Sequence, residues 1–318
     1  MKGLALAIFS VGYWKHGFSI RKAASSLLAA FGVLWLLVSI FTFFSQPEIA
    51  DHIKNYWPLF LLLGVLWTIY ENWPRHLVRC RLDNRDVHIS IRVGDLFSGD
   101  TSVIVGCNTS FDTDMSGNLI SRKSVQGQYT TRYFDSVNHL DAEINDSLRN
   151  IAPESTNQNK PGKVNIYPIG TTVTLRARNR TAYFCAISRM NAQGNAESSF
   201  EDIKSCLPKL WEYITATGDH GNIAIPVLGT GFSRLPNPRA EIIREIVQSF
   251  VAACAAQKPC DSLSIVIQPK DFYRHEVNLT ELGRFLEHVC KYTNFVGANA
   301  GGRGQALPDV PAANPGAI

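Results

Sequence analysis

The chain has 318 residues, of which 45% are apolar, 10% aromatic and 18% charged. This length allows one globular domain with an additional module, and the abundance of apolar over charged residues excludes a disordered protein. Residues 1–82 carry eight Lys and Arg against three Asp and Glu, whereas residues 83–318 carry 23 against 24. Because the basic excess lies in the most apolar part of the chain, we expect a membrane module at 1–82, a near-neutral soluble domain after it, and no face that binds nucleic acid.

Two apolar segments in the first 82 residues are predicted to be transmembrane helices. The first, at 23–44, has about 22 residues, which in a helix extend roughly 33 Å and cross a bilayer core. The second, at about 55–72, is shorter and has Trp and Tyr toward its ends, as is typical of the membrane interface. Gly32 and Gly64 would allow the two helices to pack closely. The alternatives are buried helices of a soluble core or, at the N-terminus, a cleaved signal peptide.

Basic residues flank the two segments on their outer sides, and the loop between them has two acidic residues and one lysine. The positive-inside rule therefore places both ends of the chain in the cytoplasm. The flanking basic residues are Lys15, Arg21 and Lys22 before the first segment and Arg75, Arg79 and Arg81 after the second. The seven cysteines are odd in number and contain no C-x-x-C, which indicates reduced cytosolic thiols and neither a disulfide framework nor a zinc site.

The region 83–292 alternates between strand and helix patterns. Strands alternating with helices indicate an α/β sandwich with a largely parallel sheet. The Gly-, Ala- and Pro-rich residues 293–318 are predicted to be a disordered tail. Strands are predicted at 87–93, 101–107, 172–178, 181–187, 222–228 and 263–268, and helices at 135–151, 198–217, 238–256 and 279–292.

Three segments that follow predicted strands carry glycine or polar side chains: 94–96, 106–113 and 228–232. Ligands of open α/β sheets bind beyond the carboxyl ends of the strands. Glycines at such positions allow positive φ and close approach of backbone amides to a diphosphate, although a tight strand-to-helix turn explains them equally well. An Asp after a strand is likewise a common helix cap. Taken together, the three segments predict a nucleotide site.

The arrangement over 85–292 resembles a macro domain, the ADP-ribose-binding module. The resemblance implies a three-layer α/β/α sandwich with a mixed, largely parallel sheet. It also implies that Asp95, in a G-D-L motif, binds the adenine amino group and that Asn108 faces the distal ribose. Residues 229–232 are then expected to hold the diphosphate, with Phe232 beside the distal ribose.

The sequences VIVGCNTSFDT and ISRKSVQGQYTTRYF are similar to the macro branch of Thoeris anti-phage defence effectors, which carry two N-terminal transmembrane helices. This resemblance implies a bacterial inner-membrane protein that senses an NAD-derived ADP-ribose signal made by a partner TIR-domain enzyme. On activation it would form a homo-oligomer, disrupt the lipid bilayer and cause abortive infection. The N-A-A-N hallmark of macro domains is absent, since Val105 stands three residues before Asn108 and FDTDMSGN replaces a glycine-rich loop. We therefore expect a receptor, with a membrane-tethered ADP-ribosyl hydrolase or a passive binding adaptor as the alternatives.

No catalytic residue, metal or cofactor is predicted, because no histidine has the sequence context of a base for Cys107 and the histidines lack metal-ligand spacing. Phe272, just past the last strand, is expected to stack on the adenine unless it is a core aromatic. The predicted ligand-binding residues are Asp95, Leu96, Asn108, Phe111, Thr113, Ser124, Leu228, Gly229, Thr230, Gly231, Phe232 and Phe272. Five polar residues are expected either to form a rewritten distal-ribose pocket, with the carboxylates facing a cationic or imidazole substituent, or to be ordinary loop residues: Asp112, Thr113, Asp114, Ser124 and Gln128.

Overall fold

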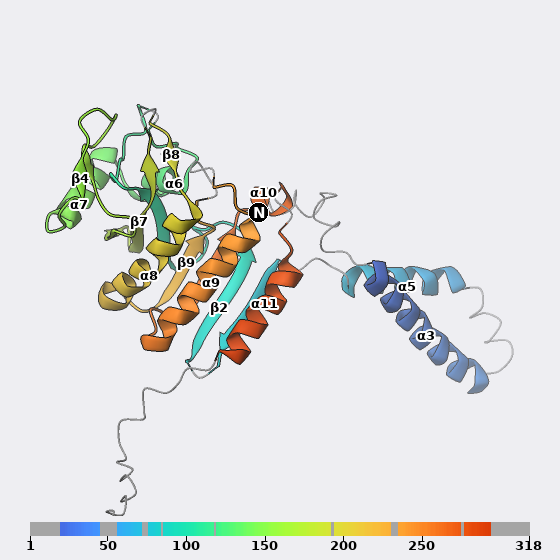
Figure 1. The fold of residues 1–318 in the computed structure, drawn as a ribbon. Helices are drawn as coiled ribbons and strands as arrows, with labels where there is room; N and C mark the ends of the chain where they lie inside the picture. The colour runs from blue at the N-terminus through green and yellow to red at the C-terminus, as the bar shows by residue number, and fades with distance from the viewer. Residues whose placement is uncertain are drawn as a thin grey trace, which may run out of the picture.

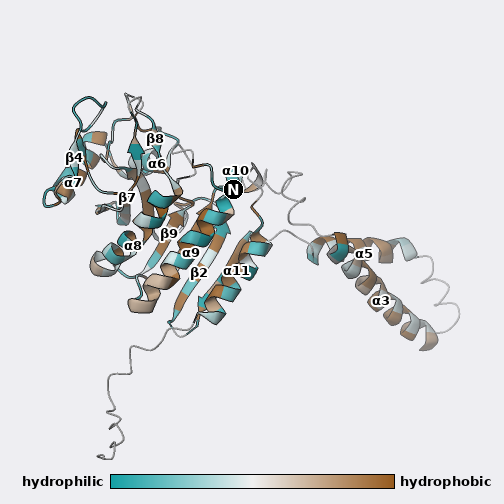
Figure 2. Ribbon diagram, in the orientation of Figure 1, coloured by the Kyte–Doolittle hydropathy of each residue, from teal (hydrophilic) through white to brown (hydrophobic). Residues whose placement is uncertain are grey.

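The computed structural model describes residues 20–44, 56–71, 76–83, 85–117, 119–191, 194–229, 235–274 and 277–293. Near the N-terminus, α3 (Ile20–Phe44) and α5 (Trp57–Glu71) are strongly apolar helices. Within the described residues, one helix is long and apolar enough to cross a membrane, over Ala23–Phe44. The helix α5, with 15 residues, is shorter than the predicted 55–72. Figure 2 shows both helices hydrophobic along most of their length.

The two apolar helices contact each other at Gly64. A Cβ placed on this glycine would lie 3.3 Å from Cζ of Phe31, so the absent side chain is what lets the Phe31 ring approach α5. The hydroxyl of Thr68 donates to the Gly64 carbonyl at 2.8 Å, which satisfies this polar group within its own helix. The packing role predicted for Gly64 is confirmed, whereas Gly32 has no atom of another part of the protein within 4 Å of an added Cβ.

The remaining described residues form a mixed sheet covered by helices (Figure 1). Its central strands run parallel in the order β2, β10, β9, β3, β7, and the antiparallel strands β1 and β6 lie at the two edges. The strands are β1 (Leu77–Leu82), β2 (Val87–Val93), β3 (Ser102–Asn108), β6 (Thr172–Ala177), β7 (Arg180–Met190), β9 (Asn222–Pro226) and β10 (Ser262–Ile267), with the short β8 (Ala196–Glu197) paired to β7. A separate hairpin pairs β4 (Ser155–Thr156) with β5 (Asn165–Ile166).

Alternating side chains of the buried strands supply two hydrophobic cores, one on each face of the sheet. On β3, Ile104 packs into one core, whereas Val103 and Val105 pack into the other. The first core is completed by α8 (Phe200–Thr217), α9 (Arg239–Ala256) and α11 (Leu279–Tyr292), and the second by α6 (Val125–Tyr133) and α7 (Val137–Leu148). The expected three-layer α/β/α sandwich with a largely parallel sheet is therefore the observed fold.

Besides the short β4, β5, β8 and α10 (Pro269–Arg274), which were not predicted, two larger elements of the α/β domain differ from the sequence prediction. The strand β1 lies inside the range assigned to the membrane module, yet it pairs with β2 along its whole length, so the sheet begins at Leu77 and not after residue 82. Arg79 and Arg81 consequently belong to a sheet strand and not to a membrane-flanking loop. The helix α6 was not predicted, because its sequence VQGQYTTRY is polar and rich in weak helix formers. The expected tail, apart from Thr293, lies outside the described residues.

Candidate functional site

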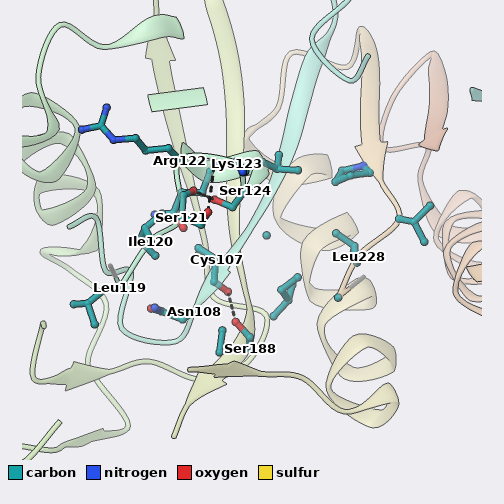
Figure 3. A pocket seen from close by; sticks show the side chains of 18 of the residues that line it. Cys107, Asn108, Leu119, Ile120, Ser121, Arg122, Lys123, Ser124, Ser188 and Leu228 are labelled. Carbon is teal, nitrogen blue, oxygen red and sulfur yellow. Dashed lines mark hydrogen bonds between the residues drawn. The ribbon is translucent and has the colours of Figure 1, made fainter. Parts of the chain in front are cut away.

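A cavity of ≈ 860 Å³ opens at the carboxyl ends of the parallel strands β3, β7, β9 and β10. Its floor includes Asn108 and Ser188 at the ends of two of these strands, and Leu228 and Gly229 form part of its wall. The opposite wall is the loop that precedes α6 (Figure 3). This is the edge of the sheet at which the sequence predicted a ligand site.

Of the predicted ligand-binding residues, four line this cavity: Asn108, Ser124, Leu228 and Gly229. Gly229 has a φ of 67°, which confirms the left-handed conformation expected of the glycine-rich turn. Its carbonyl accepts a hydrogen bond from the amide of Leu235 at 3.0 Å, which holds these two residues close together. Thr230, Gly231 and Phe232 lie outside the described residues.

Asn108 is 3% exposed, and most of its amide group is already hydrogen-bonded within the protein. Its Oδ1 accepts from the backbone amides of Ser110 and Asp112, at 3.1 and 3.2 Å, and its Nδ2 donates to Asp112 Oδ2 at 3.0 Å. These bonds leave one Nδ2 hydrogen uncommitted. Asn108 therefore shapes the loop at the cavity floor and retains a single donor for a ligand.

Asp112 lies behind this floor as part of a buried ion pair. Its carboxylate is 3.1 Å from Lys160 Nζ, and the two side chains are 1% and 3% exposed. The same carboxylate accepts from the backbone amide of Lys163 at 2.6 Å, while the Asp112 carbonyl accepts from Gln126 Nε2 at 2.7 Å. Asp112 therefore ties the floor loop to the β4–β5 hairpin through its carboxylate and to α6 through its carbonyl, and it does not line the cavity.

Asp95 follows β2 at the same edge of the sheet but does not line the cavity. One carboxylate oxygen accepts from the Phe97 amide at 3.1 Å, and the other is 3.1 Å from Nη1 of Arg132, whose guanidinium lies 4.5 Å from the centre of the Phe97 ring. The side chain is 53% exposed, so it remains reachable from solvent. Asp95 thus fixes the turn that follows β2, with an arginine as a second partner; residues 96–101 contain no helix, so the helix-cap alternative is not what the structure shows.

Four other predicted ligand contacts are directed away from the cavity. Phe111 is fully buried and packs edge-on against Tyr167, and Leu96 and Phe272 belong to the two hydrophobic cores. For Phe272, the core alternative is therefore the one observed. The hydroxyl of Thr113 donates to Asp141 at 2.8 Å.

The polar residues around α6 serve mainly to fix loops. Ser124 caps α6 by accepting from the Gly127 amide at 3.0 Å, and Gln128 donates from Nε2 to the Lys123 carbonyl at 2.9 Å. Asp114 accepts from Ser116, and these hydrogen bonds lower the pKa of its carboxyl group. These side chains order the loops around α6, and Ser124 among them also lines the cavity.

Several lining residues were not predicted from the sequence: Arg122, Lys123, Gln126, Ser188, Gln268 and Asp271. The basic pair stands inside the segment ISRKSVQGQ, so the sequence contained a signal, but only the hydroxyl and amide residues of that segment were chosen. Gln268 and Asp271 come just after β10, where the sequence analysis selected the aromatic Phe272. Strand-end position alone would have found both.

Cys107 lines the cavity beside Asn108 but is poorly suited to nucleophilic chemistry. Burial raises the pKa of its thiol well above the ordinary value, and Cys185 nearby raises it further. The thiolate, not the thiol, is the reactive form. Among the residues that the structure describes, no group of three His, Cys, Asp or Glu is arranged to hold a metal ion.

The fold and the strand-end cavity define this part of the chain as an α/β domain of the macro type. The family model described as "Thoeris protein ThsA, Macro domain" matches residues 89–268, and the chain belongs to this family. A curated relative, the Thoeris protein ThsA of Bacillus amyloliquefaciens (strain Y2), is 24% identical over 229 residues, which cover 70% of this chain and 75% of the relative.

Solved macrodomains also resemble the chain, at low identity. The Oceanobacillus iheyensis macrodomain with ADP aligns with 15% identity and a TM-score of 0.46, over 67% of this chain and 99% of that one. The Trypanosoma brucei macrodomain in complex with ADP aligns with 10% identity and a TM-score of 0.40, over 59% of this chain and 66% of that one.

Proposed function

We propose that the protein is a membrane-anchored anti-phage defence effector whose macro domain binds an ADP-ribose-derived nucleotide. The observation that carries the proposal is the ≈ 860 Å³ cavity at the ends of four parallel strands in a domain of the ThsA macro family. The apolar helix Ala23–Phe44 is long enough to anchor this domain in a bilayer, and α5 packs on it. The family relative's name, Thoeris protein ThsA, supports the defence role.

The nucleotide is the signal in this proposal, and permeabilisation of the membrane is the response. A partner TIR-domain enzyme makes the nucleotide from NAD, and its binding favours a homo-oligomer that repacks the apolar helices and permeabilises the inner membrane, with both termini in the cytoplasm. A ligand shifts such an equilibrium only by its differential affinity for the two states, about 1–3 kcal/mol per site. Several sites in one oligomer add their contributions.

Binding is tested with the purified full-length chain in detergent, by calorimetry with ADP-ribose, NAD and ATP. Asn195 is exposed and lines the cavity, so Asn195→Trp should block the cavity without disturbing the core. Glu212→Trp, at an exposed position on α8 that does not line the cavity, is the matched control. We expect ADP-ribose to bind the wild type and the control but not Asn195→Trp. No binding to the wild type, or equal binding to all three, would refute a nucleotide site in this cavity.

The response is tested by reconstituting the same three proteins in dye-loaded vesicles. We expect ADP-ribose or its conjugate to cause leakage and a larger assembly with the wild type and Glu212→Trp only. Binding without leakage would leave a passive adaptor. Chromatography of the nucleotide after incubation decides the remaining alternative, because multiple turnover to a product would make the protein a hydrolase.

A further inference from the structure

The loop Ser121–Ser124, which forms one wall of the cavity, is held rigidly by its own hydrogen bonds. The hydroxyl and the amide of Ser124 donate to the Ser121 carbonyl, at 2.7 and 3.0 Å, and the Lys123 amide donates to Ser121 Oγ at 3.2 Å. A backbone fixed in this way presents the side chains of Arg122 and Lys123 from a defined position.

The helix α6 holds the same loop from the other side. A Cβ on Gly127 would lie 2.8 Å from Cα of Arg122 and would overlap the Ser121 carbonyl, so only glycine permits this close approach of helix and loop. The bond from the Gln128 side chain to the Lys123 carbonyl adds a further tie. Hydrogen bonds within the loop and its contact with α6 therefore fix the backbone that carries Arg122 and Lys123.

The charged ends of Arg122 and Lys123 are uncommitted. In the part of the chain that the structure describes, neither side chain makes a hydrogen bond or an ion pair, whereas Arg132, Lys160 and Lys163 each have a carboxylate partner. Both are exposed residues that line the cavity; in Figure 3 the Arg122 side chain extends away from the cavity, so it reaches a ligand there by changing its rotamer. The backbone of the loop is therefore fixed by hydrogen bonds, while the two cationic side chains are available to a ligand.

The charge balance of the cavity favours an anion. The described lining residues include one carboxylate, Asp271, which acts electrostatically on the neighbouring buried Arg239. Asp112, behind the floor, is paired with Lys160, and Asp114, in the same loop, accepts from Ser116 and Gly117 and does not line the cavity. Two free cations therefore outweigh the negative charge that faces the cavity, and a concave surface of one sign concentrates ligands of the opposite sign.

We propose that Arg122 and Lys123 are the anion-recognition residues of this cavity and bind the diphosphate of its ligand. The inference rests on the proposed function and adds two full positive charges to any contact that backbone amides make with the diphosphate. A ligand with two adjacent phosphates gains two charge-assisted contacts, whereas an uncharged nucleoside gains neither. ADP and ADP-ribose should therefore bind far better than adenosine.

The test compares ADP-ribose, ADP and adenosine on the full-length chain in detergent by calorimetry. Lys123→Met is expected to weaken ADP-ribose binding about tenfold, and the double variant Arg122→Met/Lys123→Met more, with adenosine binding unchanged. Lys123→Arg, which keeps the charge, should stay close to the wild type. Lys258→Met removes a partly exposed lysine that is paired with Asp261, just before β10 and at the end of the strands opposite the cavity, and should leave the binding of all three ligands unchanged. A second measurement on the wild type should show ADP-ribose binding weakening as salt rises.

The outcomes separate the two proposals. If the wild type binds ADP-ribose and the Met variants bind it equally well, or if Lys123→Arg is as weak as Lys123→Met, the cationic contact is wrong and the proposed function stands. If the wild type binds neither ADP nor ADP-ribose, the proposed function fails and the inference with it. Losses confined to the diphosphate ligands and to the Met variants would establish the anion site.

Discussion

The buried ion pair between Lys160 and Asp112 gives the sharpest stability prediction. Lys160→Met keeps an unbranched, flexible side chain in place but leaves the Asp112 carboxylate without its counter-charge, at a site where the side chains are 3% and 1% exposed. Removing one partner of a buried pair costs about 3–5 kcal/mol. The amide of Lys163 and the side chain of Asn108 still donate to this carboxylate, so we expect the lower end, about 3 kcal/mol.

A loss of about 3 kcal/mol corresponds to a fall of roughly 6–12 °C in the Tm of a domain of the size of this macro domain. The measurement is thermal and urea unfolding of the full-length chain, followed by tryptophan fluorescence. The control is Lys163→Met. The ion pair of Lys163 with Asp141 is more accessible to solvent, with side-chain exposures of 24% and 33%. Its loss should therefore lower the free energy of unfolding by about 1 kcal/mol or less. Equal losses in the two variants, or a loss below about 1 kcal/mol for Lys160→Met, would refute the reasoning from burial.

Three further changes are predicted. Gly64→Val should separate α3 from α5, because a Cβ there lies 3.3 Å from the Phe31 ring, and unchanged migration of the helix pair on denaturing gels would contradict this contact. Ser199→Ala should cost about 1 kcal/mol at pH 7 by breaking the capping box with Asp202. Burial alone would raise the pKa of Asp202, but hydrogen bonds from Ser199 and its other partners hold that pKa below its ordinary value. The cap's stabilisation is therefore present above about pH 4 and lost as pH falls further, and urea unfolding should show a smaller effect of the variant at pH 3 than at pH 7. Gly127→Ala should displace the cavity loop, cost about 1–3 kcal/mol and weaken ADP-ribose binding, and wild-type values for both would show that the loop does not rest on this glycine.

Strand-end motifs predicted the end of the sheet at which the cavity lies but not the role of each side chain. Asn108 and Gly229 were placed correctly because a buried apolar run followed by a polar or glycine turn is a local pattern. Asp112 and Thr113 belong to the same loop, yet their partners, Lys160 and Asp141, come from distant segments. No local pattern reveals which of several loop carboxylates will be neutralised by a buried lysine.

The sequence by itself determined the alternation of strands and helices, the apolar helix at the N-terminus and the edge of the sheet where a ligand site lies, because all three depend on periodicity and composition over short stretches. Only the tertiary structure decided that β1 joins the sheet, that Phe111 and Phe272 fill cores, and that Arg122 and Lys123 lie beside the cavity with no partner among the described residues. These outcomes depend on which groups meet across long separations in the chain. Burial and pairing, unlike periodicity, are properties of the packed molecule.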